Sequence, residues 1–260
     1  MEQVLYKKEI EEIKDSGYLR KDSTITDALI DNFYNSILKK DEKKVVYVGT
    51  NAEFAPFEFL EGDKVTGFDM ELIAEIGKVA GFEVEVKNQA FDGLLPALQS
   101  GKIDLIIAGM TVTDERKKAV DFSESYYTAS QVIIVPADNA AIKSFDDLKG
   151  KNVGVQIGTT GDTVISEIKE ITNTKYNNGS EAVLALTTQK VDAVVIDNEP
   201  AKNFVAKNTG LKVVDTGAVK EDYAIAIAKG NKELLDKVNT GLKTLKENGK
   251  YDELIAKWFK

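Results

Sequence analysis

Two successive blocks of alternating apolar and amphipathic segments constrain the fold of this chain most strongly. From Lys44 onward, short apolar runs typical of buried strands alternate with segments whose apolar residues recur at helical spacing. Gly101-Lys102-Ile103-Asp104 opens the apolar run 103–108, and Gln189-Lys190-Val191-Asp192 opens the run 191–196 in the same way. This repetition predicts an α/β protein with two similar lobes rather than one large sheet.

The expected elements follow from apolar spacing, capping residues and glycine stops. Strands are predicted at 45–49, 82–87, 103–108, 130–135, 152–156, 191–196, 211–215 and 223–228. Helices are predicted at 68–80, 91–100, 145–149, 199–207, 232–247 and 251–259. A short helix is predicted to begin at 114. Two more are predicted to run from a cap at Thr160 or Asp162 to about 170, and from a cap at Ser180 to 189. Thr113 and Ser144 are the expected caps of the helices that follow them.

The first 44 residues form a separate predicted unit. Apolar residues between positions 4 and 13, and again between 25 and 37, fall near helical spacing, and the charged run 39–44 reads as a linker. We therefore expect a helical extension at 1–44. Because an exposed apolar helix face is a liability, docking on the body and self-association through these residues are the favoured alternatives.

Composition excludes several classes of function. The chain has no cysteine and no histidine, which removes disulfides, thiol nucleophiles, histidine bases and the usual zinc sites. A net charge of -9 argues against a nucleic-acid partner. No apolar run reaches membrane-spanning length, and the first ten residues lack the apolar core of a signal peptide. The sequence thus leaves two alternatives, a cytoplasmic protein or one whose leader was removed.

Five stretches in this order resemble the bacterial solute-binding proteins for polar amino acids, the glutamine, arginine and lysine-arginine-ornithine type of ABC-transporter component (family 3). The resemblance runs from about 44 to 260 and does not include 1–44. The stretches are Val48 to Phe59, Gly67-Phe68-Asp69, Ala108 to Arg116, Val153 to Gly161, and Asp192 to Asp197.

The resemblance implies a two-lobed, periplasmic-binding-protein-like fold of type II. The chain is expected to cross between the lobes near 127–131 and 220–224. The first lobe then consists of 45–128 and 222–260, and the second of 129–221. Two crossings define a hinge about which the lobes close on a ligand.

Arg116 and Asp197 are the predicted partners of the two charges of an amino acid. An arginine fork suits a carboxylate, and family members use this arginine in that way. The residues alone also allow a solvated arginine. Asp197 ends an apolar strand, where α/β folds bind ligands, and the resemblance assigns it to the ligand ammonium. Its alternative role is the N-cap of the helix that follows.

The remaining expected contacts come from both blocks. Gly158 to Gly161 follows a strand and opens a helix, so Thr159 and Thr160 are predicted to meet the ligand carboxylate, unless the segment is an ordinary capped turn. The Gly109 carbonyl and the Thr111 hydroxyl are expected to accept from the ligand ammonium, and the Thr111 N–H to donate to its carboxylate, unless both residues merely end a strand; Met110 between them is also counted as a site residue. Phe54 and Phe91 resemble an aromatic pair around the ligand stem, although core packing is their default role.

Four polar residues are candidates for side-chain specificity: Asn51, Glu53, Asp69 and Gln156. Asn51 stands where many relatives carry an aspartate, and Gln156 replaces the lysine of the glutamine-specific branch. Loss of that lysine favours a cationic side chain, which Glu53 could pair with, unless Glu53 is a solvated loop acid. We therefore expect arginine or lysine as the ligand, followed by glutamine.

The function implied is binding of a free L-amino acid for delivery to the membrane permease of an ABC importer, without a cofactor or metal. A periplasmic or extracytoplasmic, membrane-anchored location is expected. Two alternatives remain: a cyclohexadienyl dehydratase-like enzyme, for which Glu53 would be the general acid, and a sensor domain that passes closure to a receptor.

Overall fold

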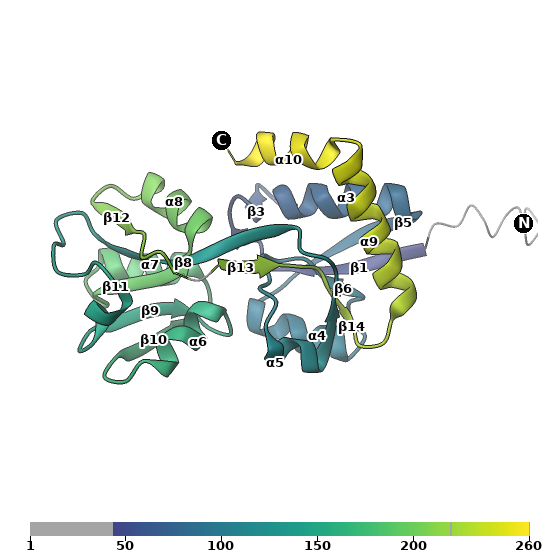
Figure 1. Cartoon of the computed structure of the whole chain (residues 1–260). Helices are drawn as coiled ribbons and strands as arrows, with labels where there is room; N and C mark the ends of the chain where they lie inside the picture. Colours follow the sequence, from purple (N-terminus) through teal and green to yellow (C-terminus); the bar gives the residue numbers. More distant parts are fainter. Residues whose placement is uncertain (1–43, 219, 260) are drawn as a thin grey trace, which may run out of the picture. The chain divides into compact units, whose positions relative to one another are not determined.

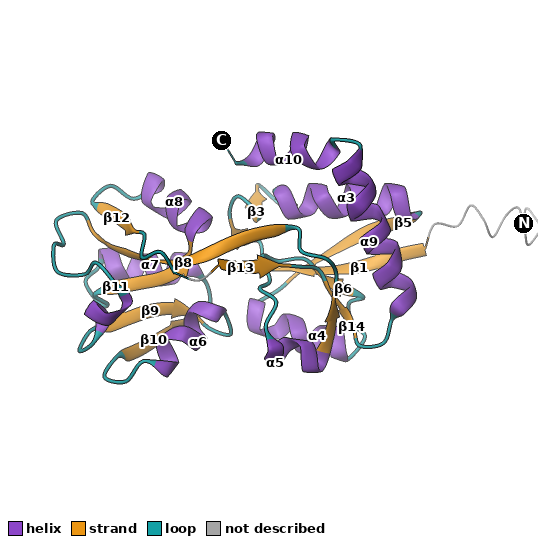
Figure 2. Ribbon diagram, viewed as in Figure 1, coloured by secondary structure: helices purple, strands orange, loops and turns teal. Residues whose placement is uncertain are grey.

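The computed structural model describes residues 44–218 and 220–259 of the chain. The predicted helical extension at 1–44 lies outside these residues, apart from Lys44, which begins the first described strand. The residues from Lys44 onward form one compact unit. This unit contains two sheets with helices packed against them (Figure 1, Figure 2).

The first lobe is built on a five-stranded sheet of order β5-β1-β6-β14-β7. Its strands are β1 (Lys44–Thr50), β5 (Phe82–Asn88), β6 (Leu105–Ile106), β7 (Val120–Phe122) and β14 (Ala226–Ala228), beside a hairpin sheet of β2 (Glu53–Phe54), β3 (Glu58–Glu61) and β4 (Lys64–Thr66). Its helices are α3 (Phe68–Ala80), the 3₁₀ turn η1 (Phe91–Gly93), α4 (Leu94–Gln99), α5 (Asp114–Ala119), α9 (Lys232–Glu247) and α10 (Lys250–Trp258).

The apolar run of β6 explains why this sheet is covered on both faces. Leu105 and Ile107 belong to the core cluster that includes α3 and α9, whereas Ile106 belongs to the cluster formed with α4. Successive side chains of a strand point to opposite faces, so an unbroken apolar run needs helices on both sides. The predicted α/β class is confirmed.

The second lobe is built on a sheet of order β10-β9-β11-β8-β12, with β13 paired to β8. Its strands are β8 (Tyr127–Pro136), β9 (Asn152–Gln156), β10 (Thr172–Tyr176), β11 (Ala193–Asp197), β12 (Leu211–Val214) and β13 (Lys220–Tyr223). Its helices are the 3₁₀ turn η2 (Phe145–Leu148), α6 (Thr160–Glu167), α7 (Gly179–Thr187) and α8 (Asn198–Lys207).

Two strands connect the lobes. In Figure 1, β8 and β13 run side by side between the two sheets, and they pair antiparallel from Tyr127↔Tyr223 to Ser130↔Lys220. These strands begin and end close to the two predicted crossings. The residue boundaries of the lobes remain a prediction.

The repeated four-residue pattern has the same structural role in both lobes. The Asp104 carboxylate accepts the Tyr47 N–H (2.8 Å) of β1, and the Asp192 carboxylate accepts the Asn152 N–H (2.8 Å) of β9. In each case the aspartate N–H also donates back to the carbonyl of the same residue. The aspartate therefore starts the pairing of an apolar strand with its parallel neighbour. The repeated sequence pattern reflects this structural role rather than a contact with a ligand.

Two predicted caps are wrong, and both true caps lie N-terminal to the residue chosen. Thr159, rather than Thr160 or Asp162, caps α6 by accepting the Asp162 N–H (3.2 Å). Asn178, rather than Ser180, caps α7 by accepting the Glu181 N–H (2.8 Å). Both residues have extended backbone, which an N-cap requires and which capping preference alone does not reveal.

Two predicted strands are shorter or divided. The run 103–108 contributes only β6, because its first residues pair through Asp104 and its end turns at Gly109, whose φ is 50°. The predicted strand 223–228 is divided between β13 and β14. Between them, the Ala224 N–H donates to Met110 O and the Ile225 N–H donates to Ser123 Oγ. Here the chain leaves β13, which pairs with β8, and enters the first sheet as β14.

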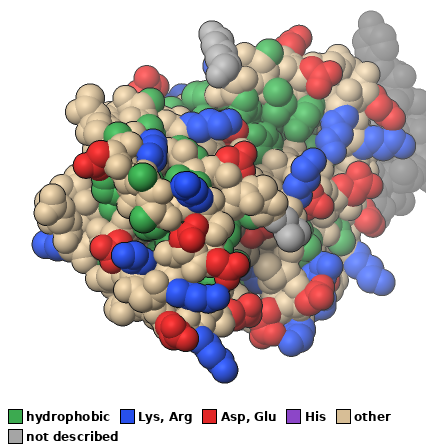
Figure 3. Space-filling view, turned by 60° about the vertical axis from the view of Figure 1, so that its left-hand side comes forward, with side chains coloured by type: hydrophobic (Ala, Val, Ile, Leu, Met, Phe, Trp, Pro, Cys, Tyr) green, Lys and Arg blue, Asp and Glu red, His purple; other side chains and the backbone are tan. Residues whose placement is uncertain are grey.

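Charged side chains of both signs are interspersed over the face drawn in Figure 3. Most of the described ion pairs are exposed and join residues three or four apart on one helix, so they contribute little to stability. Within 44–218 and 220–259, no helix has the length and apolar character needed to cross a membrane.

Candidate ligand-binding cleft

A cavity is lined by residues of both lobes, and its empty volume, which includes space open to solvent, is about 310 Å³. The lining residues of the first lobe are Asn51, Phe54, Glu58, Phe91, Ala108, Gly109, Thr111 and Arg116, and those of the second lobe are Gln156, Thr159, Thr160 and Asp197. The fold thus gathers the predicted site residues around one space, with the exceptions of Glu53, Asp69 and Met110.

Arg116 is held in the cavity wall by contacts to both lobes. The Thr113 hydroxyl caps α5 by accepting the Arg116 N–H (3.1 Å), which confirms the predicted cap. Nη1 donates to Thr111 O (2.7 Å) and Nη2 to Gly158 O (3.0 Å). The guanidinium carbon lies 5.5 Å from the centre of the Phe91 ring.

The environment of Arg116 is that of a buried functional cation. The residue is 9% exposed, and burial lowers the pKa of its guanidinium. The next residues of the same helix, Lys117 and Lys118, are exposed. A guanidinium has five N–H donors, and these two carbonyls occupy two of them, so three remain for a bound anion.

Asp197 lies at the carboxyl end of β11 and is 6% exposed. Its backbone occupies the N-cap position of α8, but its side chain makes no capping hydrogen bond. Its Oδ1 instead accepts from Gln131 Nε2 (3.0 Å). Burial, followed by the nearby charge of Glu221, raises the pKa of the Asp197 carboxyl to about 7. Among the residues that the structure describes, the Asp197 carboxylate has no cationic partner, and it lines the cavity.

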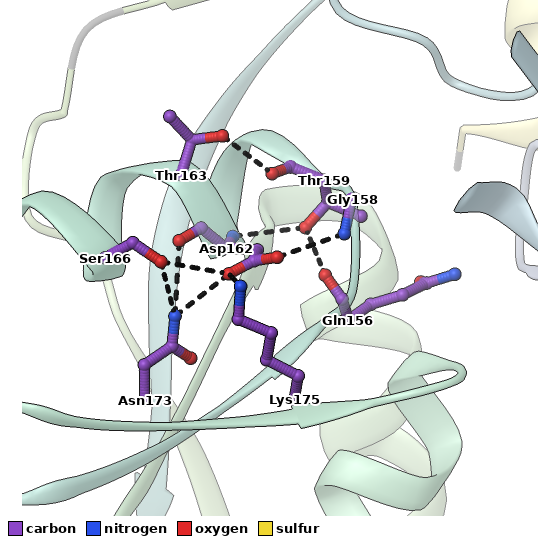
Figure 4. Close-up of polar contacts among 8 residues, drawn as sticks. All are labelled: Gln156, Gly158, Thr159, Asp162, Thr163, Ser166, Asn173 and Lys175. Carbon is purple, nitrogen blue, oxygen red and sulfur yellow. Dashed lines mark hydrogen bonds and ion pairs between the residues drawn. The ribbon is translucent and has the colours of Figure 1, made fainter.

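The turn before α6 is braced by Asp162, one turn into the helix (Figure 4). Asp162 Oδ2 accepts the Gly158 N–H (3.1 Å). Oδ1 accepts from Asn173 Nδ2 (2.9 Å) and Ser166 Oγ (3.2 Å), and it pairs with Lys175 Nζ (2.9 Å). These partners come from β10 and α6, so the network fixes the turn whose carbonyl receives Arg116.

Gly109 is set in place by a buried aspartate. Asp69, at the start of α3, accepts the Gly109 N–H (2.9 Å) and the Tyr126 hydroxyl (2.8 Å) through Oδ2. Burial raises the pKa of Asp69 to about 6. A Cβ at Gly109 would lie 2.8 Å from the Phe54 ring, so only glycine lets the ring approach this strand end. Asp69, predicted as a specificity candidate, does not line the cavity.

Glu58 is a cavity residue that the sequence interpretation missed. Its side chain is 1% exposed, and neither carboxylate oxygen has a hydrogen-bond donor among the described residues. Burial, together with the charge of Asp69, raises the pKa of Glu58 well above its usual value. Its position two residues after Pro56, on the buried side of a short hairpin strand, was the available signal. Ala108, also missed, contributes only a small apolar surface.

Two predicted site residues lie elsewhere. Glu53 is exposed and accepts from Ser180 Oγ (3.1 Å) on α7, in a shallow groove outside the cavity. Met110 is fully buried in the core cluster that includes Leu94 and Ile106. Alternation explains Met110, because its neighbours Gly109 and Thr111 face the cavity and Met110 therefore faces the opposite side.

Asn51 and Gln156 meet across the cavity. Gln156 Nε2 donates to Asn51 Oδ1 (2.9 Å), and Asn51 Nδ2 donates to Gln89 O (3.1 Å). Both side chains are buried. They join the two lobes at the cavity wall, where Arg116 is the only cationic side chain among the described lining residues. Among the described residues, no cluster of acidic side chains has the arrangement of a metal site.

Residues 46–260 match the model of one protein family, described as bacterial extracellular solute-binding proteins, family 3. The chain belongs to this family. This match confirms, at the level of the family, the resemblance of the sequence to solute-binding proteins for amino acids. The two-lobed fold is that of the type II periplasmic binding proteins.

Relatives of this family 3 solute-binding protein match over most of its length. The arginine-binding extracellular protein ArtP of Bacillus subtilis (strain 168) is 40% identical over 223 residues, covering 84% of this chain and 87% of the relative. A solved ancestral arginine-binding protein bound to arginine is 46% identical, with a TM-score of 0.82, over 84% of this chain and 99% of that one. Another, bound to glutamine, is 47% identical, with a TM-score of 0.80, over 84% and 98%.

Proposed function

We propose that this solute-binding protein closes around one free L-amino acid with a cationic side chain and delivers it to an ABC importer. One observation carries the proposal: a buried arginine and a buried aspartate, supplied by different lobes, face the same cavity. An α-amino acid carries one carboxylate and one ammonium, which match Arg116 and Asp197. The relatives named for arginine binding support the same reading.

The charges left over in the cavity favour a cationic side chain. Once Arg116 and Asp197 are assigned to the two α-groups, Glu58 is the remaining ionisable lining residue. A buried carboxyl without a donor accommodates a guanidinium or ammonium that brings both charge and hydrogen bonds. We therefore favour arginine or lysine over glutamine. Because Glu58 rather than Glu53 lines the cavity, the specificity role moves to Glu58.

A calorimetric and thermal-shift comparison of arginine with citrulline tests the side-chain assignment. Citrulline has nearly the same shape but a neutral end group. Arginine at 100 times its dissociation constant should stabilise the protein by about 2.7 kcal/mol, and citrulline should bind more weakly. Glu58→Gln should reduce this preference. Equal binding of both ligands would contradict the cationic assignment, and no response to any amino acid would contradict the function.

A second candidate function is elimination of water by a cyclohexadienyl dehydratase-like enzyme. The observation that favours it is Glu58, whose raised pKa in an enclosed site suits a general acid. A turnover assay with prephenate and arogenate separates the two functions. We expect no turnover, because the described lining residues include no second acid–base group that could remove a proton while Asp197 holds an ammonium.

The family description places its members outside the cytoplasm, and we propose the same location for this chain, with membrane anchoring. Self-association through residues 1–44 and a receptor-linked sensing role remain predictions of the sequence. Size measurement of the full chain and of a chain that begins at Lys44 tests the first of these.

A further inference from the structure

Glu221 joins the two lobes through a single carboxylate oxygen. Its Oε2 accepts from the Thr111 hydroxyl (2.8 Å) of the first lobe and from the Thr160 hydroxyl (2.7 Å) of the second. Gln131 Nε2 lies 3.3 Å from the same oxygen. Both threonines line the cavity, whereas Glu221 stands behind them on β13.

This arrangement fixes the direction of two hydroxyl protons. An ionised carboxylate only accepts hydrogen bonds, so each threonine must direct its single hydroxyl proton toward Glu221. The Thr160 oxygen also accepts from Gln131 Nε2 (3.1 Å). What each threonine can still offer to the cavity through its hydroxyl is an oxygen lone pair, which suits a ligand group that donates. The predicted contact of Thr160 with the ligand carboxylate would then have to come from its backbone N–H rather than from its hydroxyl.

The same carboxylate is coupled to Asp197. Gln131 Nε2 donates to Asp197 Oδ1 (3.0 Å) as well as approaching Glu221, so one amide nitrogen lies between the two acids. The other ionisable groups that face this pair are Arg116 from α5, Glu58 from β3 and Tyr223 from β13. The described surroundings thus hold more acidic than basic groups, which again favours an arriving cation.

We propose that Glu221 is a positioning residue of the amino-acid site, which turns the hydroxyls of Thr111 and Thr160 into acceptors and so selects a ligand α-ammonium. The inference rests on the proposed function. It extends that function by assigning the recognition of the ammonium to a group that does not itself line the cavity.

Glu221→Gln tests the inference, because glutamine keeps the shape but loses the charge and can turn a donor toward the threonines. The measurement is calorimetric affinity for arginine and for its α-hydroxy analogue, between pH 5 and pH 9. The preference of the wild type for arginine over the analogue should fall about tenfold in the variant. The pH below which arginine binding weakens should move downward, because Asp197 loses a neighbouring negative charge.

Asp222→Asn is the matched control, since Asp222 is the next residue of β13, is exposed, and accepts from Thr128 away from the cavity. It should leave both quantities unchanged. Glu221→Asp keeps the charge and should retain a pH profile close to that of the wild type. If the wild type binds arginine and Glu221→Gln matches it in preference and pH profile, the role of Glu221 is overturned. Failure of the wild type to bind any amino acid overturns the proposed function and this inference with it.

Discussion

At the scale of single residues, Arg116 combines two demands that usually conflict. Its guanidinium is buried, yet it keeps donors free for a ligand because its two described hydrogen bonds go to backbone carbonyls rather than to carboxylates. An arginine already paired with an acid would have little remaining affinity for an anion. The absence of such a pair among the described residues around Arg116 is therefore what makes it available to a ligand carboxylate.

Arg116→Ala should weaken amino-acid binding by roughly 30- to 5000-fold, because truncating one member of a buried charge pair costs about 2–5 kcal/mol. Isothermal titration calorimetry measures the change directly. Lys117→Ala is the matched control, because Lys117 lies on the same helix but is exposed and pairs with Asp114 at the surface. Unchanged affinity in Arg116→Ala would remove this residue from the site.

Sequence patterns located most of the cavity wall but ranked its acids wrongly. Arg116, Asp197 and the turn before α6 could be predicted, because each follows a strand end or a helix start that the apolar pattern reveals. Glu53 lies on the two-residue strand β2 and Glu58 on the four-residue strand β3 of the same hairpin, and only the second is buried. Strands this short have too few residues for their alternation to show which side chains are buried. The sequence therefore favoured the exposed Glu53 over the buried Glu58.

At the scale of elements, the turn before α6 depends on a side chain that comes after it. Asp162 was weighed as a cap of its helix, but its carboxylate reaches back to Gly158 and sideways to β10. Capping preference is a local property, whereas this network requires β10 to lie beside α6. Only the folded arrangement could show it.

Asp162→Asn should lower the free energy of unfolding by about 1–3 kcal/mol, since it leaves Lys175 and the partly buried hydrogen bond of the Gly158 N–H with a poorer partner. It should also weaken ligand binding, because the Gly158 carbonyl holds Arg116. Urea denaturation and calorimetry measure the two effects. Asp146→Asn, which breaks an exposed pair with Lys149, is the control and should stay within about 0.5 kcal/mol of the wild type.

The first residue of the repeated four-residue pattern is Gly101 in one lobe and Gln189 in the other. Gly101 has a φ of 72° and Gln189 a φ of 58°, so both lie in the left-handed region, where glycine is favoured. Gln189→Gly should raise the free energy of unfolding by up to about 1 kcal/mol, and Gly101→Ala should lower it by a similar amount. Equal and opposite shifts in the urea midpoint are expected, whereas shifts of the same sign would contradict the argument.

At the scale of the whole molecule, acids buried without cationic partners dominate the pH response. The pKa values of Glu58, Asp69 and Asp197 are all raised by burial, to about 6 for Asp69 and about 7 for Asp197. Asp162 has a lowered pKa and changes charge only below the usual carboxyl range. Above that range, the three raised groups set the direction of the response.

The ligand-free protein should therefore lose stability as the pH rises from about 5 to about 8, above the range in which the lowered pKa values of Glu71, Asp121, Asp147 and Glu233 act in the opposite direction. The folded state binds more protons than the unfolded state in this window, so each such proton lowers the stability by up to about 1.4 kcal/mol per pH unit. Urea midpoints across the range measure the slope. Asp197→Asn should flatten the part near pH 7, and a stability that rises through the window would contradict the assigned environments.

The paired strands β8 and β13 limit how the cleft can open. Their ladder of four residue pairs resists sliding of one strand along the other, since a shift of register would break every pair, but it allows the ribbon to bend and twist. Separation of the lobes then grows with distance from the ribbon. The distance between Thr111 and Thr160 would change least, because both bind Glu221 on the ribbon itself. The Glu53–Ser180 contact between β2 and α7 would lie at the outer edge of the cleft and would break first.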